Sequence, residues 1–239
     1  MDGDRLLALA SDQKPGAVRV ALGGKMIVFG STLSPFVRKV HVFAAEKGVE
    51  VSGRQNRGPD GPDADFLVAS PFRKIPAMRD GDFSLADSSA IVAYMEKKHP
   101  EPALIPSEAK AHARTLWFEE VADTILGPAT IAVFFNRVLA RRFGLEPDLA
   151  AADKAERDQI PPALAYLETV IPASGFLVED RLTLADIAVA SFFVNLSYVQ
   201  IAPDPQTQPR LAAYVAGILG RPSFQRLIDS DKAVLQPAA

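Results

Sequence analysis

Residues 26–48 read MIVFGSTLSPFVRKVHVFAAEKG and carry the strongest indication of the type of fold. It begins with a short apolar run, Met26 to Phe29, closed by Gly30, and a run of this length predicts a buried strand rather than a helix. A helix is expected from Ser34-Pro35, because serine is a good N-cap and proline suits the first helical position. Gly48 ends its apolar stripe. The stretch therefore predicts a strand followed directly by a helix.

The next fifty residues extend this pattern. The expected elements are a strand at 49–51, an irregular stretch at 53–62 and a short helix at 64–68. Asp80-Gly81 lies between apolar runs at 75–78 and 83–85, and it predicts a hairpin because both residues readily adopt turn conformations. Asp87-Ser88 then occupies the N-cap position of a helix that ends near His99-Pro100. The predicted order is βαβ followed by ββα.

The remainder of the chain has helical periodicity only. We expect an N-terminal extension at 1–25, in which Val18, Val20 and Leu22 alternate as in a strand, an α/β domain at 26–100, a linker at 101–106 and an all-helical domain at 107–239. The expected helices cover 107–143 with a bend at Gly127-Pro128, 149–170 with Pro161-Pro162 inside it, 187–199, 208–219 and 223–230. Thr183-x-x-Asp186 is a capping box in front of the apolar helix at 187–199. The fold class is α+β.

Composition excludes several classes of function. The chain has no cysteine, so disulfides, thiolate metal sites and a cysteine nucleophile of its own are ruled out. Its 26 basic and 29 acidic residues give a net charge of −3 without a basic stripe, which argues against nucleic acid as a partner. No apolar run approaches the roughly 18 residues of a membrane span, and the N-terminus does not read as a secretion signal. The three histidines are scattered, so no metal is expected, and a cytoplasmic protein is the default.

Four motifs, taken in order and spacing, resemble the cytosolic glutathione transferase family. They are Ser34-Pro35-Phe36, Lys74-Ile75-Pro76, Asp87-Ser88 and Thr183-x-x-Asp186, and the resemblance covers about residues 26–231. It implies a thioredoxin-like first domain that binds glutathione as co-substrate, an all-helical second domain, and a homodimer. The implied activity is conjugation of glutathione to a small hydrophobic electrophile in detoxification, with no metal, nucleic acid or membrane as partner.

Ser34 is the candidate catalytic residue, since the resemblance, here to the tau class, places its hydroxyl beside the glutathione sulfur. Lowering a thiol pKa from about 8.5 by two units requires about 2.7 kcal/mol of preferential thiolate stabilisation. A hydrogen bond to an anion contributes roughly 1.5–3 kcal/mol, and a helix N-terminus adds several tenths. Ser34 therefore need only donate a hydrogen bond. The simpler interpretation is a helix cap alone, and Ser31 and Thr32 are rival candidates.

The resemblance also assigns the glutathione-binding residues, which are Phe36, Lys74, Ile75, Pro76, Asp87 and Ser88. A cis peptide bond before Pro76 would let Ile75 present its amide and carbonyl to the cysteinyl part of the peptide. Ser88 would receive the γ-glutamyl carboxylate, Asp87 the ammonium group, and Lys74 a carboxylate of the peptide. The alternatives are a proline at a strand start, a helix-capping pair and a solvated lysine.

Two kinds of alternative function remain open. The same thiolate supports isomerisation, dehalogenation, ether cleavage or peroxide reduction, although the Ser-Ser-Cys type motif of maleylacetoacetate isomerases is missing around Ser31 to Phe36. A non-catalytic glutathione-fold protein that binds ligands or serves in assembly is the other. Glutaredoxin-like chemistry is excluded, because it needs a protein thiolate and the chain has none.

Overall fold

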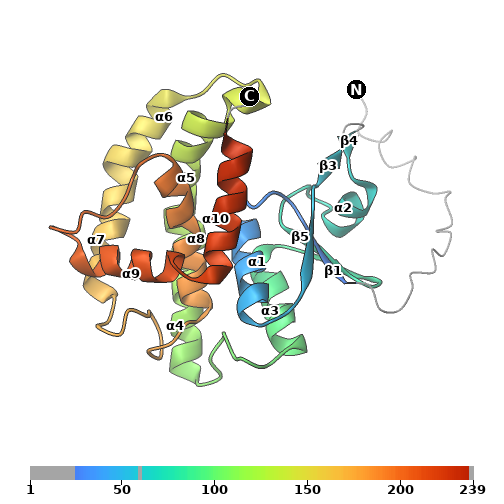
Figure 1. Cartoon of the computed structure of the whole chain (residues 1–239), viewed down its shortest axis with the longest axis horizontal. Coiled ribbons are helices and arrows are strands. Elements are labelled where there is room, and N and C mark those ends of the chain that lie inside the picture. The colour runs from blue at the N-terminus through green and yellow to red at the C-terminus, as the bar shows by residue number, and fades with distance from the viewer. Residues whose placement is uncertain (1–24, 59–60, 237–239) are drawn as a thin grey trace, which may run out of the picture.

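A computed structural model describes residues 25–58 and 61–236 of the chain. It contains a sheet domain and a helical domain side by side (Figure 1). This architecture confirms the predicted fold class. The expected strand around Val18 to Leu22 lies outside the described residues. Within the described ranges, no helix combines the length and apolar character needed to cross a membrane.

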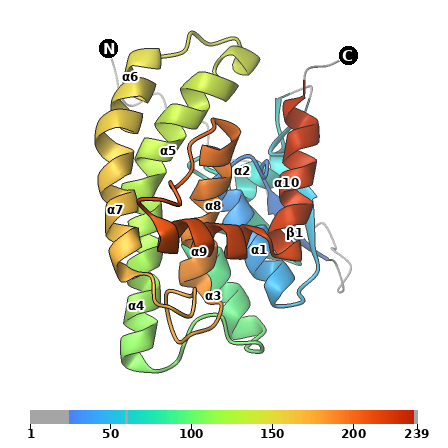
Figure 2. The same ribbon diagram turned by 60° about the vertical axis from the view of Figure 1, so that its left-hand side comes forward.

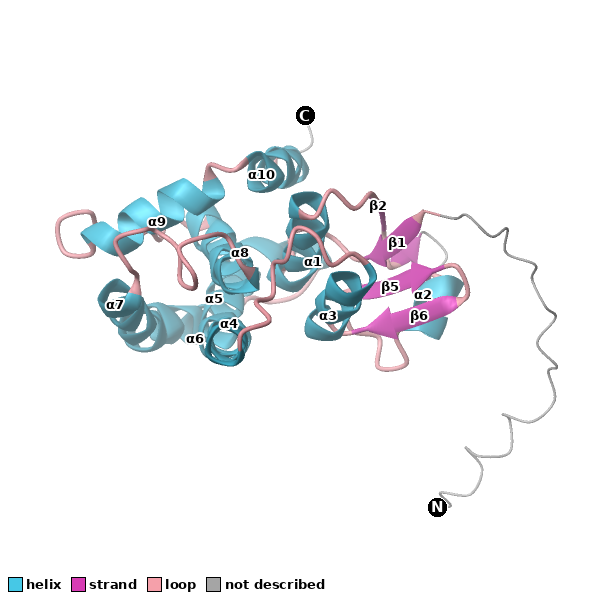
Figure 3. Ribbon diagram, turned by 90° about the horizontal axis from the view of Figure 1, so that it is seen from below, coloured by secondary structure: helices cyan, strands magenta, loops and turns pink. Residues whose placement is uncertain are grey.

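The first domain is built on a four-stranded sheet with the strand order β2-β1-β5-β6. Its strands are β1 (Met26–Phe29), β2 (Val51–Arg54), β5 (Ala77–Asp80) and β6 (Phe83–Ala86), with β1 parallel to β2 and antiparallel to β5. Helices α1 (Pro35–Glu46) and α3 (Ser88–Lys98) cover the face turned toward the helical domain, and α2 (Ala64–Ala69) covers the other (Figure 3). The β5–β6 hairpin turns at Asp80-Gly81, as predicted.

Strand boundaries are where the sequence prediction was wrong. The strand expected at 49–51 is β2 at 51–54, because its parallel register pairs Val51 with Met26 and continues to Arg54. The hairpin strand starts at Ala77 instead of Ile75, since Ala77 pairs with Phe29 and the preceding Pro76 has no amide hydrogen to contribute. In the stretch expected to be irregular, β3 (Arg57–Gly58) pairs with β4 (Gly61–Pro62).

The helical domain follows the predicted order with different helix ends and no sharp proline kinks (Figures 1 and 2). Its segments are α4 (Ala109–Glu120), η2 (Val121–Leu126), α5 (Gly127–Phe134), η3 (Phe135–Leu139), η4 (Arg141–Phe143), α6 (Leu149–Lys154), η5 (Ala155–Gln159), α7 (Ile160–Val170), α8 (Leu184–Tyr198), α9 (Pro209–Leu219) and α10 (Pro222–Leu235). The π-helical segments η2 and η5 end two positions before Pro128 and Pro161, so each proline falls in the first turn of a new α-helical segment.

Two further helix predictions were off at their ends. The last helix continues to Leu235 instead of stopping at 230, and Arg142 donates hydrogen bonds to the carbonyls of Val234 and Leu235 at its end. The central helix, α8, begins at Leu184 and is buried along nearly its whole length, in contact with α1, α4, α5 and α9 (Figure 2). Asn195 begins an Asn-Leu-Ser sequence of the kind that accepts N-linked glycans, but the residue is only 1% exposed in this helix.

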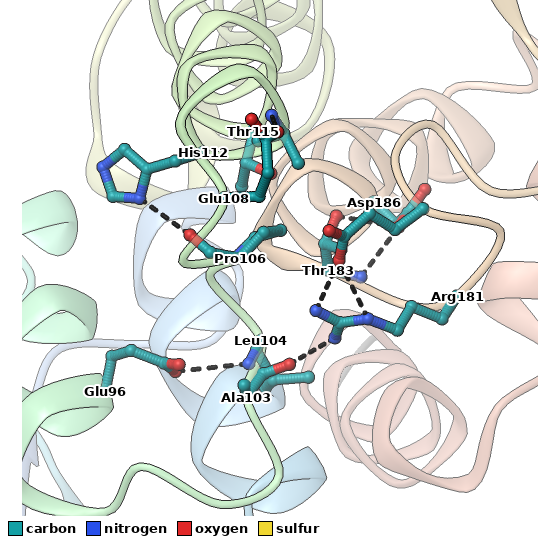
Figure 4. A network of polar contacts seen from close by, with 12 residues as sticks. Glu96, Ala103, Leu104, Pro106, Glu108, His112, Thr115, Arg181, Thr183 and Asp186 are labelled. Carbon is teal, nitrogen blue, oxygen red and sulfur yellow. Dashed lines mark hydrogen bonds and ion pairs between the residues drawn. The ribbon is translucent and has the colours of Figure 1, made fainter.

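The segment joining the domains is held from both sides (Figure 4). The amide of Leu104 donates to Glu96 of α3, and its carbonyl accepts from the amide of Leu184 at the start of α8 at 2.8 Å. Arg181 donates to the carbonyl of Ala103. The connection is therefore anchored to α3 on one side and to α8 on the other.

The capping box in front of α8 is present (Figure 4). Asp186 accepts the amide hydrogens of Thr183 and Leu177, both at 2.9 Å. Its burial raises the pKa of the Asp186 carboxyl to about 6. One side chain thus satisfies two buried amides and sets where the central helix begins.

Gly30 is the position at which three segments of the first domain meet. Its φ is +123°, and a Cβ there would lie 2.8 Å from Val37 Cγ2 and 2.9 Å from Ile75 Cβ. Neither contact can be relieved by a flexible side-chain end, because Val37 is fully buried in α1 and the Ile75 contact is to its Cβ. Only glycine fits between the end of β1, helix α1 and the segment before β5.

We expect Gly30→Ala to lower the free energy of unfolding by about 2–4 kcal/mol, from backbone strain and overpacking together. Denaturant titration followed by circular dichroism measures the change. Gly217→Ala is the matched control, because a Cβ on that helical glycine meets nothing within 4 Å. The control should be neutral or slightly stabilising. Equal effects of the two substitutions would contradict the close approach at Gly30.

Candidate functional site

A pocket of about 600 Å³ opens on the sheet domain where three of its segments converge. It is lined by Phe36 of α1, by residues 68–72 and 74–76 from the end of α2 to the residue before β5, and by residues 84–88 from β6 into the start of α3. All six predicted glutathione-binding residues line it, namely Phe36, Lys74, Ile75, Pro76, Asp87 and Ser88. Ser34 is not among the lining residues. The fold thus brings together residues 52 positions apart in sequence, from Phe36 to Ser88.

The segment before β5 is shaped by a serine that the sequence reasoning missed. Ser70 Oγ donates to the carbonyl of Lys74 at 2.7 Å and accepts from the amide of Lys74 at 2.9 Å. The following Ile75–Pro76 peptide bond is cis, as the resemblance implies. Among the described residues, the backbone N–H and C=O of Ile75 have no hydrogen-bond partner. Ile75 therefore offers one donor and one acceptor at the pocket wall.

The start of α3 supplies the polar end of the pocket. Asp87 caps the helix, because its Oδ1 accepts from the amides of Ser89 at 2.9 Å and Ala90 at 3.2 Å. Its φ of +79° is unusual for a residue with a side chain, and such strain persists where the surroundings enforce it. The hydroxyl of the buried Ser88 has no hydrogen-bond partner in the described part of the chain. A helix N-terminus with an uncommitted hydroxyl suits an anionic group.

Ser34 occupies the N-cap position of α1, yet its hydroxyl makes no capping hydrogen bond. Ser31 Oγ accepts from the amide of Leu33 at 3.3 Å, and Thr32 donates its hydroxyl hydrogen to Asp231. Of the two rivals, Thr32 has thus committed its only hydroxyl proton. Ser34 retains its donor, two residues before the pocket-lining Phe36.

A buried ionic cluster supports the pocket from behind. The ammonium of Lys39, on α1, lies 2.9 Å from Glu119 Oε1 and 2.7 Å from Asp123 Oδ2, and 3.4 Å from the hydroxyl of Ser89. Burial raises the pKa of the Asp123 carboxyl above its ordinary range. Because Ser89 follows the pocket-lining Ser88, this cluster joins the first turn of α3 to α1 and to the helical domain. Residues 25–58 and 61–236 contain no group of three or more metal-ligating side chains.

Sequence reasoning missed two parts of this site. Residues 68–72 and 84–86 line the pocket without belonging to any motif, because a wall made of loop and strand-edge residues has no periodic signal. Arg38 and Lys39, both buried in α1, were not singled out, since a charged residue in an amphipathic helix ordinarily faces water. Their local signal is that they interrupt a run of apolar residues from Phe36 to Phe43.

Both domains of the chain match models of one known protein family. Residues 28–103 match the family model of the glutathione S-transferase N-terminal domain, and residues 143–231 match that of the C-terminal domain. The chain belongs to the glutathione S-transferase family. The two matches together span most of the chain and include every pocket-lining residue.

The chain aligns with relatives in this family over nearly the full length of those relatives. Glutathione S-transferase 3 of Zea mays is 29% identical over 211 residues, which cover 84% of this chain and 92% of the relative. A glutathione S-transferase from Rhodospirillum rubrum superimposes with a TM-score of 0.75 at 26% identity, covering 84% of this chain and 91% of that one. Glutathione S-transferase I from maize, in complex with an atrazine glutathione conjugate, has a TM-score of 0.77 at 23% identity, covering 90% and 100%, and this likeness concerns the fold alone.

Proposed function

We propose that this protein is a glutathione transferase that binds glutathione in the pocket of the sheet domain, stabilises its thiolate with Ser34, and conjugates it to a hydrophobic electrophile. The observation that carries the proposal is the convergence of the unpaired Ile75 backbone groups, the Asp87 carboxylate and the Ser88 hydroxyl on one pocket. Each of the three is complementary to a different polar part of the tripeptide. Membership in the glutathione S-transferase family supports the same substrate.

The tripeptide would bind in extended form along the pocket wall. Its cysteinyl backbone would exchange hydrogen bonds with the amide and carbonyl of Ile75, as an added strand does. The γ-glutamyl carboxylate would lie at the N-terminus of α3 against Ser88, and the neighbouring ammonium group would pair with Asp87. Lys74, exposed at the pocket, makes no ion pair with any described residue and is placed to meet a carboxylate of the ligand.

Activation of the thiol needs only a hydrogen-bond donor near the sulfur. The Ser34 hydroxyl is available because it does not cap α1, while its position at the start of that helix adds the favourable end of the helix dipole. These two contributions together match the roughly 2.7 kcal/mol that a shift of two pKa units requires. The serine itself is neither a base nor a nucleophile in this scheme, since the sulfur supplies the electron pair.

Ser34→Ala should raise the pKa of the bound glutathione thiol by about 1–2 units and lower kcat/KM at neutral pH by about 10- to 100-fold. The pH profile of conjugation with an activated aryl chloride measures both. Ser31→Ala tests the rival serine, whose hydroxyl accepts from the amide of Leu33; the proposal expects a smaller change in the thiol pKa there than in Ser34→Ala. If Ser34→Ala retains the wild-type thiol pKa and rate, Ser34 does not stabilise the thiolate.

Asp87→Asn separates binding from helix capping at one position. Asparagine caps as well as aspartate, so the melting temperature should hold, while loss of the charge should weaken glutathione binding by about 10-fold. Isothermal titration calorimetry measures the affinity. Asp148→Asn is the control, because Asp148 also caps a helix, accepting from Ala151 at 2.9 Å, but does not line the pocket. Unchanged affinity in Asp87→Asn would restrict Asp87 to capping.

The same thiolate would serve peroxide reduction, dehalogenation, ether cleavage or isomerisation, and a panel of electrophiles distinguishes these from conjugation. Retention on immobilised glutathione without turnover of any member of the panel would instead indicate a non-catalytic glutathione-binding protein. Either result leaves the assigned binding residues in place and changes the reaction.

We also propose that the protein is a cytoplasmic homodimer, on the strength of its family. Size-exclusion chromatography with light scattering should give a mass of about two chains, that is, twice 25.7 kDa. A single-chain mass at micromolar concentration would contradict this.

A further inference from the structure

The loop that carries Ser34 is tied to the helical domain through a buried arginine. Arg38, on α1, is fully buried, and its backbone amide donates to the carbonyl of Ser34 at 2.9 Å. Its guanidinium donates to the carbonyl of Ser191 at 2.7 Å and to Asn195 Oδ1 at 2.6 Å, both on α8. A third hydrogen bond, at 2.9 Å, goes to Asp231 Oδ2 on α10. One side chain thereby connects three helices at a point one turn beyond Ser34.

Two of the residues that accept hydrogen bonds from Arg38 also contact the loop directly before Ser34. Asn195 Nδ2 donates to the carbonyl of Leu33 at 3.0 Å, and the hydroxyl of Thr32 donates to Asp231 Oδ1. Arg38 orients both partners. Its guanidinium donates to Asn195 Oδ1, so the other end of that amide, Nδ2, faces the carbonyl of Leu33. It likewise occupies one oxygen of Asp231 and leaves the other for Thr32. Two consecutive loop residues are therefore fixed from α8 and α10.

These contacts bear on Ser34 because its own hydroxyl has no partner among the described residues. Its position consequently depends on the backbone of residues 31–34, where the Ser34 amide donates to the carbonyl of Ser31 at 3.0 Å. Catalytic groups must be held within about 0.5 Å of their productive geometry, and a misplacement of about 1 Å can cost about 100-fold in rate. A loop fixed only at its ends would not meet that requirement.

We propose that Thr32, Asn195 and Asp231, oriented by Arg38, are positioning residues that hold the Ser34 hydroxyl toward the thiolate of bound glutathione. This inference rests on the proposed function. It adds a role for the helical domain, which thus acts on the thiol-activating residue itself as well as holding the electrophile.

A role limited to joining the domains does not account for the whole network. The apolar contact of α1 with α8 and the separate Lys39–Glu119 pair already join the two domains. The Thr32 hydroxyl donates from the loop to Asp231 on α10, and the Asn195 amide nitrogen donates from α8 to the loop, so both contacts hold the loop before Ser34 and neither involves the body of α1. The expected consequence of removing either is a change in thiol activation with little change in stability.

Thr32→Val tests the proposal, because valine keeps the shape of threonine and removes only the donor to Asp231. We expect the pKa of the thiol of bound glutathione to rise by about 0.5–1 unit and kcat at neutral pH to fall by about 3- to 10-fold. The dissociation constant of glutathione should stay within about twofold, since no pocket-lining residue changes. Thr32→Ser should restore the wild-type pH profile, as it restores the hydroxyl.

Thr207→Val is the matched control. It removes a comparable hydrogen bond, from Thr207 Oγ1 to Asp204 Oδ2 at 3.1 Å, on an exposed loop of the helical domain. The control should leave the thiol pKa and kcat unchanged. Melting temperatures of both valine variants are measured first and should stay within about 4 °C of the wild type. If Thr32→Val does not fold, Thr32→Ala removes the same hydroxyl with a smaller side chain and takes its place.

The outcomes distinguish failure of the positioning role from failure of the proposed function. If Ser34→Ala raises the thiol pKa while Thr32→Val behaves as Thr207→Val does, the positioning role is overturned and the proposed function stands. If Ser34→Ala also leaves the thiol pKa unchanged, both are overturned. A loss of glutathione affinity in Thr32→Val without a shift in thiol pKa would likewise contradict positioning of Ser34.

Discussion

Two neighbouring buried cations on α1 determine how the two domains fit together. Arg38 pairs with Asp231 of α10, and Lys39 pairs with Glu119 of α4, both at 2.9 Å. Consecutive helix positions point about 100° apart, so the two side chains reach different helices of the second domain. A buried cation without its partner is strongly unfavourable, so α1 can occupy only the one position at which both are paired.

The pairing of Arg38 and Lys39 with the helical domain also fixes the geometry of the candidate site. The first turn of α1 carries Ser34 and Phe36, and the Lys39 cluster reaches Ser89 in the first turn of α3. Both helix starts that border the pocket are therefore supported by the buried ion pairs with the helical domain, although every residue that lines the pocket comes from the sheet domain. Gly30 completes this arrangement, since it lets the end of β1 approach α1 and Ile75 closely.

Local signals predicted most of the elements, and long-range pairing decided their ends. Ser34-Pro35, Asp80-Gly81 and Thr183-x-x-Asp186 each begin or turn an element through contacts within a few residues, so the sequence displays them. The starts of β2 and β5 depend on their register with β1, which no local pattern specifies. Six pocket residues were identified by family motifs, whereas the loop walls of the pocket carry no motif.

Neighbouring residues and composition were enough to predict the order of the strands and helices apart from the β3–β4 pair, the family, and the absence of any protein thiol. Only the tertiary structure shows that the Ser34 hydroxyl makes no capping hydrogen bond while the Thr32 hydroxyl donates to Asp231, a residue 199 positions away. It also decided that Arg38 and Lys39 are buried, although their positions in an amphipathic helix are equally compatible with exposure. Periodicity reports which face of a helix is apolar. Periodicity does not report which charged residue a side chain will pair with, because that depends on how distant segments pack.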